Sequence, residues 1–555
     1  ILLSLCRQIE QQIGKIRSEL NLGSTRGERI MTETARDKEE QRVIELAAAV
    51  DDKLQNGMDW VQAYISQEQT RSGLKKHLAM KKATAARILD AARRPMALGI
   101  FGSSQCGKSY LVSELVKGKE AALNVFVNAP GEAPLRKDYL EAINPAGGRE
   151  STAVATRFTK RPYRAVKGCS IHARLLRRVD LIKILLNGYL FECQSDFVPS
   201  EDDLLKLRKS LRGIPRDTKP LFSEEELWDL QEYVKRHLRD QTLKILDQLN
   251  YWGILTDEIR FLPFTAQIPY LEWLWGRIPR LSDLYKSLHQ ALGPLADQVV
   301  GLFQDAIVPR EKSIIDVQRL ASLNQPGNRK CAYITGDGGS GEMDTSFLCA
   351  LTKELILQVP ADLPGSLLDK MDVIDFPGAR ARDRAFDLHR LRADPGALTE
   401  VFLRGKVAFL FDALSDDRDI TGLVLCQEGG PQEAKSLPSM INKWIEWSHG
   451  SDPKARQTAP RLLFHVFTKF DLDLVRKKGE DQQVRWESRL KTNFEDFFGR
   501  AGDWVTQWNE NGPFQNCFWV RNPNVQQTVF AKTPEGRETV TDPAQLAEIR
   551  RQYLD

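Results

Sequence analysis

The sequence predicts an α/β fold with a doubly wound, mostly parallel sheet, a large helical insert and an N-terminal helical bundle. Short apolar runs alternate with helical stretches, which is typical of a parallel sheet covered by helices on both faces. One of these runs, residues 96–101, leads directly into a glycine-rich loop and then a helix. The chain has 555 residues, too many for one hydrophobic core, so we expect several domains.

The short apolar runs expected to form strands alternate with helical stretches. They are residues 96–101, 170–176, 354–359, 372–376, 407–411, 423–426, 462–467 and 517–520. The block from Val179 to Leu320 has helical spacing instead, and residues 181–191 within it predict a buried helix. We therefore expect this block to interrupt the sheet as a separate insert.

Five segments follow from this pattern. They are an N-terminal helical bundle (1–95), the first part of the sheet domain (96–176), the helical insert (177–345), the second part of the sheet domain (346–525) and the start of a truncated C-terminal region (526–555). In the first segment apolar residues recur at helical spacing, as in Val43, Leu46, Val50 and Leu54. A break between its helices is expected near Gly23.

The composition excludes several classes of protein. The 79 basic and 75 acidic residues nearly cancel, whereas a nucleic-acid binder would show a basic surplus, so no nucleic-acid partner is expected. The eight cysteines are scattered without a C-x-x-C pair, which disfavours zinc ribbons and disulfide frameworks and favours a cytoplasmic location. No apolar run approaches the length that spans a bilayer.

The glycine-rich loop after residues 96–101 has the spacing of a phosphate-binding P-loop, with strand, loop and helix in the required order. It consists of Gly102, Ser103, Ser104, Gln105, Cys106, Gly107, Lys108 and Ser109. The glycines let backbone N–H groups face one phosphate chain, and the following helix adds its positive dipole end. Lys108 would reach the β- and γ-phosphates, and the Ser109 hydroxyl would bind Mg²⁺.

Two further elements are expected to complete the phosphate and magnesium site. Asp375 ends an apolar strand, where a carboxylate can hold Mg²⁺ through water, and Gly378 can offer its N–H to the γ-phosphate. Residues 151–156 supply hydroxyls for a switch loop that closes on Mg²⁺. Thr152 is the expected ligand and Thr156 the alternative.

The base is expected to be chosen by residues 468–471, which end another apolar strand. A carboxylate at Asp471 accepts from the adjacent N–H and NH₂ donors of guanine, a donor pair that adenine lacks. Lys469 would lie along the ring face and Thr468 would steady the loop. The segment Arg521-Asn522-Pro523 follows the last strand, where a second base-contacting loop is expected.

In this order the motifs resemble those of a GTPase, and the details resemble the dynamin-like branch through Asp375–Gly378 (D-x-P-G) and Thr152–Val154 (T-A-V). The chain resembles more closely the bacterial virulence factor family of the SrfC type. The residues that carry this likeness are 155–159, 180–185, 372–380, 404–408, 468–471 and 519–523. The resemblance extends over nearly the whole chain and implies a P-loop GTPase-type sheet.

The expected function is GTP binding with Mg²⁺ and GTP hydrolysis, coupling nucleotide state to a helical region that contacts a partner or a membrane. Two residues differ from those of related GTPases in ways that affect the rate of GTP hydrolysis. Gln105 stands where dynamin-like proteins place a serine, and Ala379 cannot orient the attacking water. Arg380 and Arg382 are candidates for supplying positive charge. The alternatives are a scaffold or toxin-complex subunit that binds nucleotide with little turnover, and a P-loop ATPase.

The expected ligand is a guanine nucleotide, and two other kinds of partner are left open. One is a protein partner, including a second copy bound through the GTPase domain. The other is a membrane surface, for which the aromatic segment 268–275 is the candidate contact. Packing of that segment in a helical core is the favoured interpretation, because tryptophans in large helical blocks are usually buried.

Overall fold

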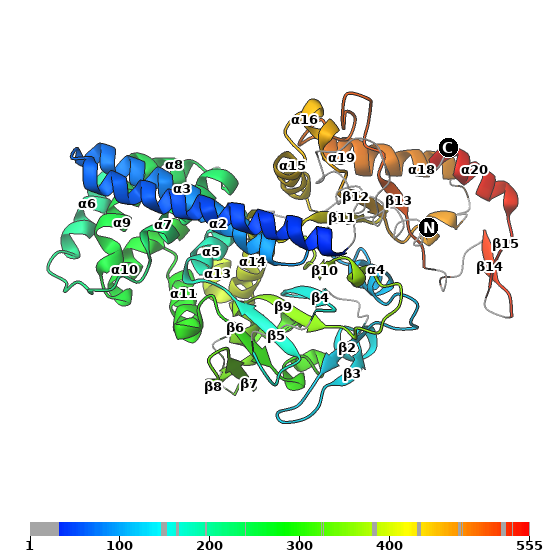
Figure 1. The fold of residues 1–555 in the computed structure, drawn as a ribbon, viewed down its shortest axis with the longest axis horizontal. Coiled ribbons are helices and arrows are strands. Elements are labelled where there is room, and N and C mark those ends of the chain that lie inside the picture. The colour runs from blue at the N-terminus through cyan, green and yellow to red at the C-terminus, as the bar shows by residue number, and fades with distance from the viewer. Residues whose placement is uncertain are drawn as a thin grey trace.

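The computed structural model describes most of the chain between Glu33 and Tyr553 (Figure 1). The described residues are 33–145, 152–161, 166–194, 197–238, 240–323, 325, 327–379, 386–429, 434–475, 479, 481–522, 525, 529–534 and 537–553. The expected break near Gly23 and the arginines Arg380 and Arg382 lie outside them.

A mixed central sheet organises the molecule. Within the described residues it has 11 strands in the order β13-β12-β11-β1-β10-β4-β9-β5-β6-β7-β8. The five strands from β13 to β10 are all parallel to one another; β4 runs antiparallel to β10 and parallel to β9, and the remaining pairs are antiparallel. Their bounds are β1 (Ala97–Gly102), β4 (Ala155–Thr159), β5 (Ile171–Leu175), β6 (Val299–Leu302), β7 (Lys330–Thr335), β8 (Ser340–Asp344), β9 (Thr352–Gln358), β10 (Asp372–Asp375), β11 (Gly422–Gln427), β12 (Leu463–Phe467) and β13 (Cys517–Trp519).

The predicted α/β class with a large central sheet is confirmed, since seven of the eight expected strand runs lie in this sheet. Two short hairpins, β2 (Asn124–Val127) with β3 (Leu135–Asp138) and β14 (Phe530–Lys532) with β15 (Glu538–Val540), stand outside it. The strands β1, β9, β10, β11 and β12 are buried along most of their length, as expected of strands that helices cover.

The run 407–411 is the exception, because it belongs to helix α14 (Pro395–Asp416) rather than to a strand. This helix crosses α5 (Arg178–Glu192) closely: a Cβ on Gly188 would lie 2.7 Å from the Val401 carbonyl oxygen. Helix α14 is apolar around much of its circumference, so its sequence lacks the polar face that would have marked it as a helix.

The predicted insert needs a correction at its C-terminal side. Its helices end with α11, and β6, β7 and β8 inside residues 177–345 join the central sheet as its last three strands. The helices of this lobe are α5, α6 (Glu201–Ser210), α7 (Glu224–His237), α8 (Gln241–Gln248), α9 (Tyr251–Asp257), α10 (Phe264–Leu271) and α11 (Pro279–Leu292). The remaining helices are α4 (Lys108–Val116), α12 (Thr345–Leu351), α13 (Leu388–Ala393), α15 (Leu437–Ser448), α16 (Pro453–Thr458), α17 (Asp471–Leu474), α18 (Gln482–Leu490), α19 (Asp496–Gly499) and α20 (Pro543–Tyr553).

The aromatic segment 268–275 forms part of the core of the helical lobe. Tyr270, Trp273 and Trp275 are buried, and the indole N–H of Trp275 donates to the Ser282 hydroxyl at 2.9 Å. The core-packing interpretation is therefore confirmed for this segment. Among the described residues, none of the helices is long and apolar enough to cross a membrane.

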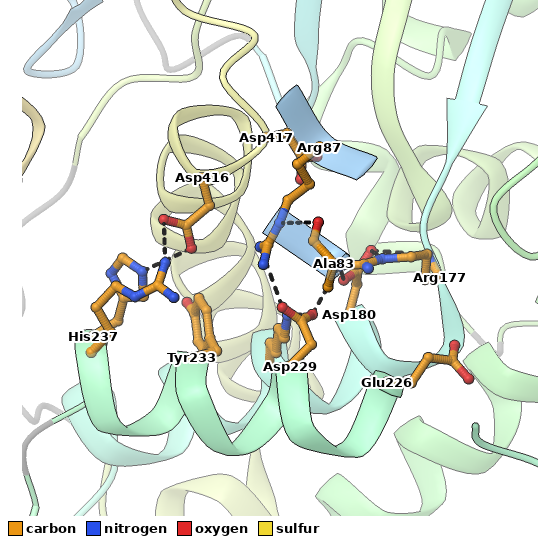
Figure 2. Close-up of polar contacts among 12 residues, drawn as sticks. Ala83, Arg87, Arg177, Asp180, Glu226, Asp229, Tyr233, His237, Asp416 and Asp417 are labelled. Carbon is orange, nitrogen blue, oxygen red and sulfur yellow. Dashed lines mark hydrogen bonds and ion pairs between the residues drawn. The ribbon is translucent and has the colours of Figure 1, made fainter. Parts of the chain in front are cut away.

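The N-terminal segment is a helical hairpin of α2 (Glu33–Tyr64) and α3 (Glu68–Arg93), which lies along the helical lobe in Figure 1. Ala79 and Ala85 of α3 are buried, and Lys76 of the same helix donates a hydrogen bond to the Gln231 side chain of α7. Figure 2 shows Arg87 of α3 reaching Asp229 of α7, with Nη1 and Oδ1 3.4 Å apart.

Asp229 is the meeting point of this junction. Besides Arg87, its carboxylate contacts Lys183 Nζ at 2.6 Å and Arg177 Nη2 at 3.4 Å. Burial opposes ionisation, but the three neighbouring cations outweigh it and hold the pKa of Asp229 well below its usual range. One carboxylate thus joins the hairpin, the start of α5 and α7.

We predict that Asp229→Asn destabilises the protein by about 3 kcal/mol, because it leaves three cations without their shared counter-charge. The measurement is thermal or urea unfolding of the full chain. Glu225→Gln, an exposed change on the same helix, is the matched control and should alter stability little. Equal stability of the two variants would contradict this role for Asp229.

Candidate functional site

The candidate site lies along the edge where the parallel strands end. Because β13, β12, β11, β1 and β10 run in the same direction, the segments that follow them emerge on one side of the sheet. The glycine-rich loop (residues 102–109) follows β1, the segment from Asp375 to Gly378 ends β10, and residues 468–471 follow β12. The structure therefore brings three of the sequence-predicted elements to one edge.

The backbone of the glycine-rich loop depends on its glycines. Gly102 has φ 152°, and a Cβ there would overlap the Cys426 carbonyl oxygen on the neighbouring strand β11. Gly107 adopts a left-handed conformation (φ 87°) immediately before α4 begins at Lys108. Gln105, at the exposed tip, is also left-handed with φ 59°. The loop therefore turns sharply twice and leaves the first amides of α4 without helical partners.

The segment after Asp375 is attached to the glycine-rich loop by backbone hydrogen bonds. The Ala379 amide donates to the Gly102 carbonyl at 2.9 Å, and the Ser104 amide donates to the Ala379 carbonyl at 3.2 Å. Gly378 permits this approach, because a Cβ on it would lie 2.5 Å from Ser104 Cα. The expected role of Gly378 toward a phosphate stays a prediction, whereas its close contact with the loop is observed.

Lys108 and Ser109 lie at the start of α4 and point back over the loop. Lys108 is buried, and its Nζ donates to the Ser103 carbonyl at 2.7 Å. The Ser109 hydroxyl donates to Asp375 Oδ2 at 2.7 Å. The two residues that the sequence assigns to Mg²⁺ are thus in direct contact, although 266 positions separate them in the chain.

Asp375 is a buried carboxyl whose second oxygen is not satisfied. Its Oδ1 has no hydrogen-bond partner within the described residues. Burial raises the pKa of Asp375 to about 6, although Lys108 and the Ser109 hydroxyl both act to lower it. A buried carboxylate oxygen without a partner is suited to accept a cation or a water molecule bound to one.

The two threonine candidates are placed differently. Thr152 forms an isolated bridge with Asp316, and no recorded contact joins it to Ser109 or Asp375. Thr156 lies on β4 directly opposite Asp375, so both side chains point to the same face of the sheet. Its hydroxyl is buried and interacts with the Tyr139 hydroxyl. The alternative ligand, rather than the expected one, is therefore adjacent to Asp375.

Cys106 faces the core beneath the loop. Its thiol is fully buried beside Cys426 of β11. A hydrogen bond from Cys426, reinforced by the charge of Lys108, lowers the pKa of Cys106 to about 7 against the opposing effect of burial. This cysteine anchors the middle of the loop to the sheet.

The predicted base-selecting segment is held by its own hydrogen bonds. Asp471 is buried, and its Oδ1 accepts from the Asn522 amide at 2.8 Å, which joins the loops after β12 and β13. Thr468 is anchored to β11 through its amide and hydroxyl, both of which donate to the Gln427 carbonyl. Lys469 is left-handed (φ 53°) and pairs with Glu428 at 2.6 Å. Pro523 lies outside the described residues.

Three residues at this edge were not identified from the sequence. Tyr110 of α4 donates its hydroxyl to Asn522 Oδ1 at 3.5 Å, which connects the P-loop helix to the last loop. Glu428 pairs with Lys469, and Arg489 of α18 donates to the Thr468 carbonyl at 2.8 Å. None of them belongs to a recognisable motif, since their roles arise only when distant segments meet.

The donor set at this edge suits phosphate more than a protein-only metal centre. Among the described residues, no group of three or more His, Cys, Asp or Glu side chains is arranged to hold a metal ion. A cation at Asp375 would therefore need ligands from a bound anion in addition to the carboxylate and the Ser109 and Thr156 hydroxyls. Mg²⁺ is usually bound in this way, through one or two protein groups and a phosphate.

We predict that Gly378→Ala destabilises the protein by about 1–3 kcal/mol, because the added methyl group meets the backbone at Ser104. The matched control is Gly73→Ala in the second turn of α3, where a Cβ would meet nothing within 4 Å. That change should stabilise by about 0.5–1 kcal/mol through helix propensity. Unfolding curves that fail to separate the two variants would contradict the close packing of Gly378.

Comparison with known proteins identifies the family. The chain belongs to the family described as putative bacterial virulence factor, whose sequence model matches residues 57–554. The match begins inside α2 and extends to the end of α20, so it includes all the segments of the candidate site. A search of curated proteins finds no match.

Proposed function

We propose that this virulence factor family member binds GTP together with Mg²⁺ along the carboxyl edge of its parallel strands. The observation that carries the proposal is the hydrogen bond between Ser109 and Asp375, 2.7 Å long, beside the buried Lys108. A hydroxyl at the start of the P-loop helix and a carboxylate at the end of a neighbouring strand are the two protein groups that Mg²⁺ needs next to a triphosphate.

The phosphate chain would lie over the start of α4. The first amides of a helix are unsatisfied donors, and the helix dipole favours negative charge there. Lys108 would exchange its bond to the Ser103 carbonyl for the β- and γ-phosphate oxygens. The Ser104 amide already donates to the Ala379 carbonyl, so the backbone donors to the phosphates would come from the residues after Ser104.

Mg²⁺ would neutralise charge on the phosphates as it builds up during phosphoryl transfer. Asp375 and Ser109 would hold it, and Thr156 is the third oxygen within the same region. The buried Oδ1 of Asp375, which has no hydrogen-bond partner within the described residues, is the observation that fits such an ion.

Guanine would be recognised by Asp471. One of its oxygens accepts a hydrogen bond from the Asn522 backbone amide. This bond holds the carboxylate between the loops that follow β12 and β13. Lys469, on the same loop, offers an aliphatic stem for the ring face. Adenine presents no pair of adjacent donors to a carboxylate, so this arrangement favours GTP over ATP.

Nucleotide binding with little turnover is the second candidate. Ala379 favours it, since both its amide and its carbonyl are bonded to the P-loop and its methyl side chain cannot orient a water molecule. The hydrolysis that we expect would then depend on charge stabilisation by Lys108, Mg²⁺ and backbone amides.

The proposal is tested by the nucleotide content of the purified 555-residue chain, followed by assays of GTP binding and phosphate release. Lys108→Ala should abolish binding, while the matched surface change Lys119→Ala should not. Binding without phosphate release would select the second candidate. Equal affinity of the native chain and Lys108→Ala would refute the site.

We predict that Asp471→Asn lowers GTP affinity at least about tenfold, because a charged acceptor for two donors is replaced by a neutral amide. Xanthosine triphosphate, whose base carries a carbonyl in place of the guanine amino group, should bind this variant better than GTP does. Asp496→Asn, an exposed change on α19, is the control. An unchanged preference for GTP over ATP in Asp471→Asn would remove the base assignment.

We predict that Mg²⁺-dependent nucleotide binding is strong at pH 8 and weakens as the pH falls through about 6, roughly tenfold per unit below it. The reason is that the proton and the cation compete for the Asp375 carboxylate. Phosphate groups also titrate near pH 6, so the informative quantity is the difference between the native chain and Asp375→Asn. A difference that stays constant from pH 5 to 8 would contradict the assignment.

A further inference from the structure

A second polar site lies at the opposite edge of the sheet, where β1 and β10 begin. A cavity of about 520 Å³ opens there beneath the C-terminal end of α3. Its wall carries eight basic side chains and five acidic ones. The basic ones include Arg93, Arg94, Arg157, Arg161, Arg174 and Lys353.

The floor of the cavity is a charged patch on the face of the central sheet. Arg157 of β4, Glu354 of β9 and Arg174 of β5 lie on three adjacent strands. Arg157 and Glu354 are buried and joined at 2.8 Å, although the interior strands of such sheets normally present apolar side chains. Burying ion pairs contributes little to stability, so this patch is not explained as a source of stability.

Acidic side chains hold these arginines in place. Asp419 does not line the cavity, but it accepts from Arg94 Nη1 at 2.6 Å and from Arg174 Nη2 at 2.8 Å. In the same way Asp417 pairs with Lys353 at 2.5 Å. The charges of the whole network nearly balance, whereas the surface that faces the cavity is predominantly basic.

Among the residues that the structure describes, the buried groups of this network that lack a hydrogen-bond partner are N–H donors. Arg157 Nη2 and Arg174 Nε are buried without a hydrogen bond within the described residues, and Arg157 Nη2 is 3.7 Å from Asp419. No carboxylate oxygen that lines the cavity is recorded as buried and unsatisfied. At the rim, Arg93 and Arg161 are exposed, and neither has an ion pair in the described part of the chain.

We propose that this cavity binds a small phosphate-bearing anion. Its volume lies in the range of small-molecule sites. Guanidinium groups match phosphate oxygens with two parallel N–H donors, and the acids behind them keep the donors oriented. The missing partners are acceptors, which a phosphate supplies.

This anion site is separate from the proposed nucleotide site. The cavity lies at the amino end of β1 and the P-loop at its carboxyl end, and the six residues of β1 span about 20 Å. The inference does not depend on GTP binding, and the experiment removes the P-loop contribution.

The test is calorimetric titration of inorganic pyrophosphate into the Lys108→Ala variant of the 555-residue chain at constant ionic strength. We expect binding of one pyrophosphate per chain. Adding Arg93→Gln with Arg161→Gln should weaken it at least about tenfold, through loss of two charge-assisted contacts. The matched double change Arg42→Gln with Arg500→Gln, on exposed arginines elsewhere, should leave it unchanged.

A variant that should strengthen pyrophosphate binding shows whether weaker binding in the double variant is due to misfolding. Asp90 lines the cavity, and its side chain is 63% exposed and only loosely paired with Arg94 at 3.7 Å. Asp90→Asn should tighten pyrophosphate binding about two- to threefold, which a damaged fold would not do. The proposal is overturned if Lys108→Ala binds no pyrophosphate, if both double variants behave alike, or if Asp90→Asn weakens binding. In those cases the arginines serve only to join α3 to the sheet.

Discussion

The hydrogen bond from the Ser109 hydroxyl to Asp375 Oδ2 is the contact on which the candidate site depends. It joins the start of α4 to the end of the strand β10, two segments that the helical lobe separates in the sequence. The parallel pairing of β1 with β10 makes the contact possible, because it sets Ile100 opposite Asp375. The backbone bonds between Ala379 and the loop then fix the same two segments a few residues later.

The two edges of the sheet use buried charge differently. At the carboxyl edge, Asp375 is a carboxylate with an empty acceptor and a pKa raised to about 6 by burial, so it is poised to take a cation. At the amino edge, Arg157 and Arg174 are cations with unused donors and carboxylates behind them. Both arrangements cost free energy in the isolated chain, and both are suited to a ligand of opposite charge.

The sequence was sufficient for the features that follow from local pattern. The strand–loop–helix around Gly102, the acidic strand end at Asp375 and the segment at 468–471 were located correctly, because each combines an apolar run with residues that mark its end. The same reasoning failed at 407–411, since a helix buried on several sides lacks the polar face that distinguishes it from a strand. It also missed β6 to β8, which lie within a block dominated by helical spacing.

Side-chain contacts between segments that are distant in the sequence could not be predicted from local sequence patterns. Thr156 rather than Thr152 lies opposite Asp375 because β4 pairs antiparallel with β10, which no motif encodes. The Tyr110–Asn522 contact and the arginine-lined cavity likewise depend on the order of strands in the sheet. The guanine preference and the magnesium site remain proposals built on positions that the sequence identified and the fold brought together.

The most direct test of the central claim is equilibrium dialysis of the native chain with labelled GTP at pH 8, with and without Mg²⁺ and with excess ATP as competitor. The account predicts one GTP per chain, bound more tightly with Mg²⁺ and not displaced by ATP. Absence of GTP binding, or displacement by ATP as effective as by unlabelled GTP, would contradict it.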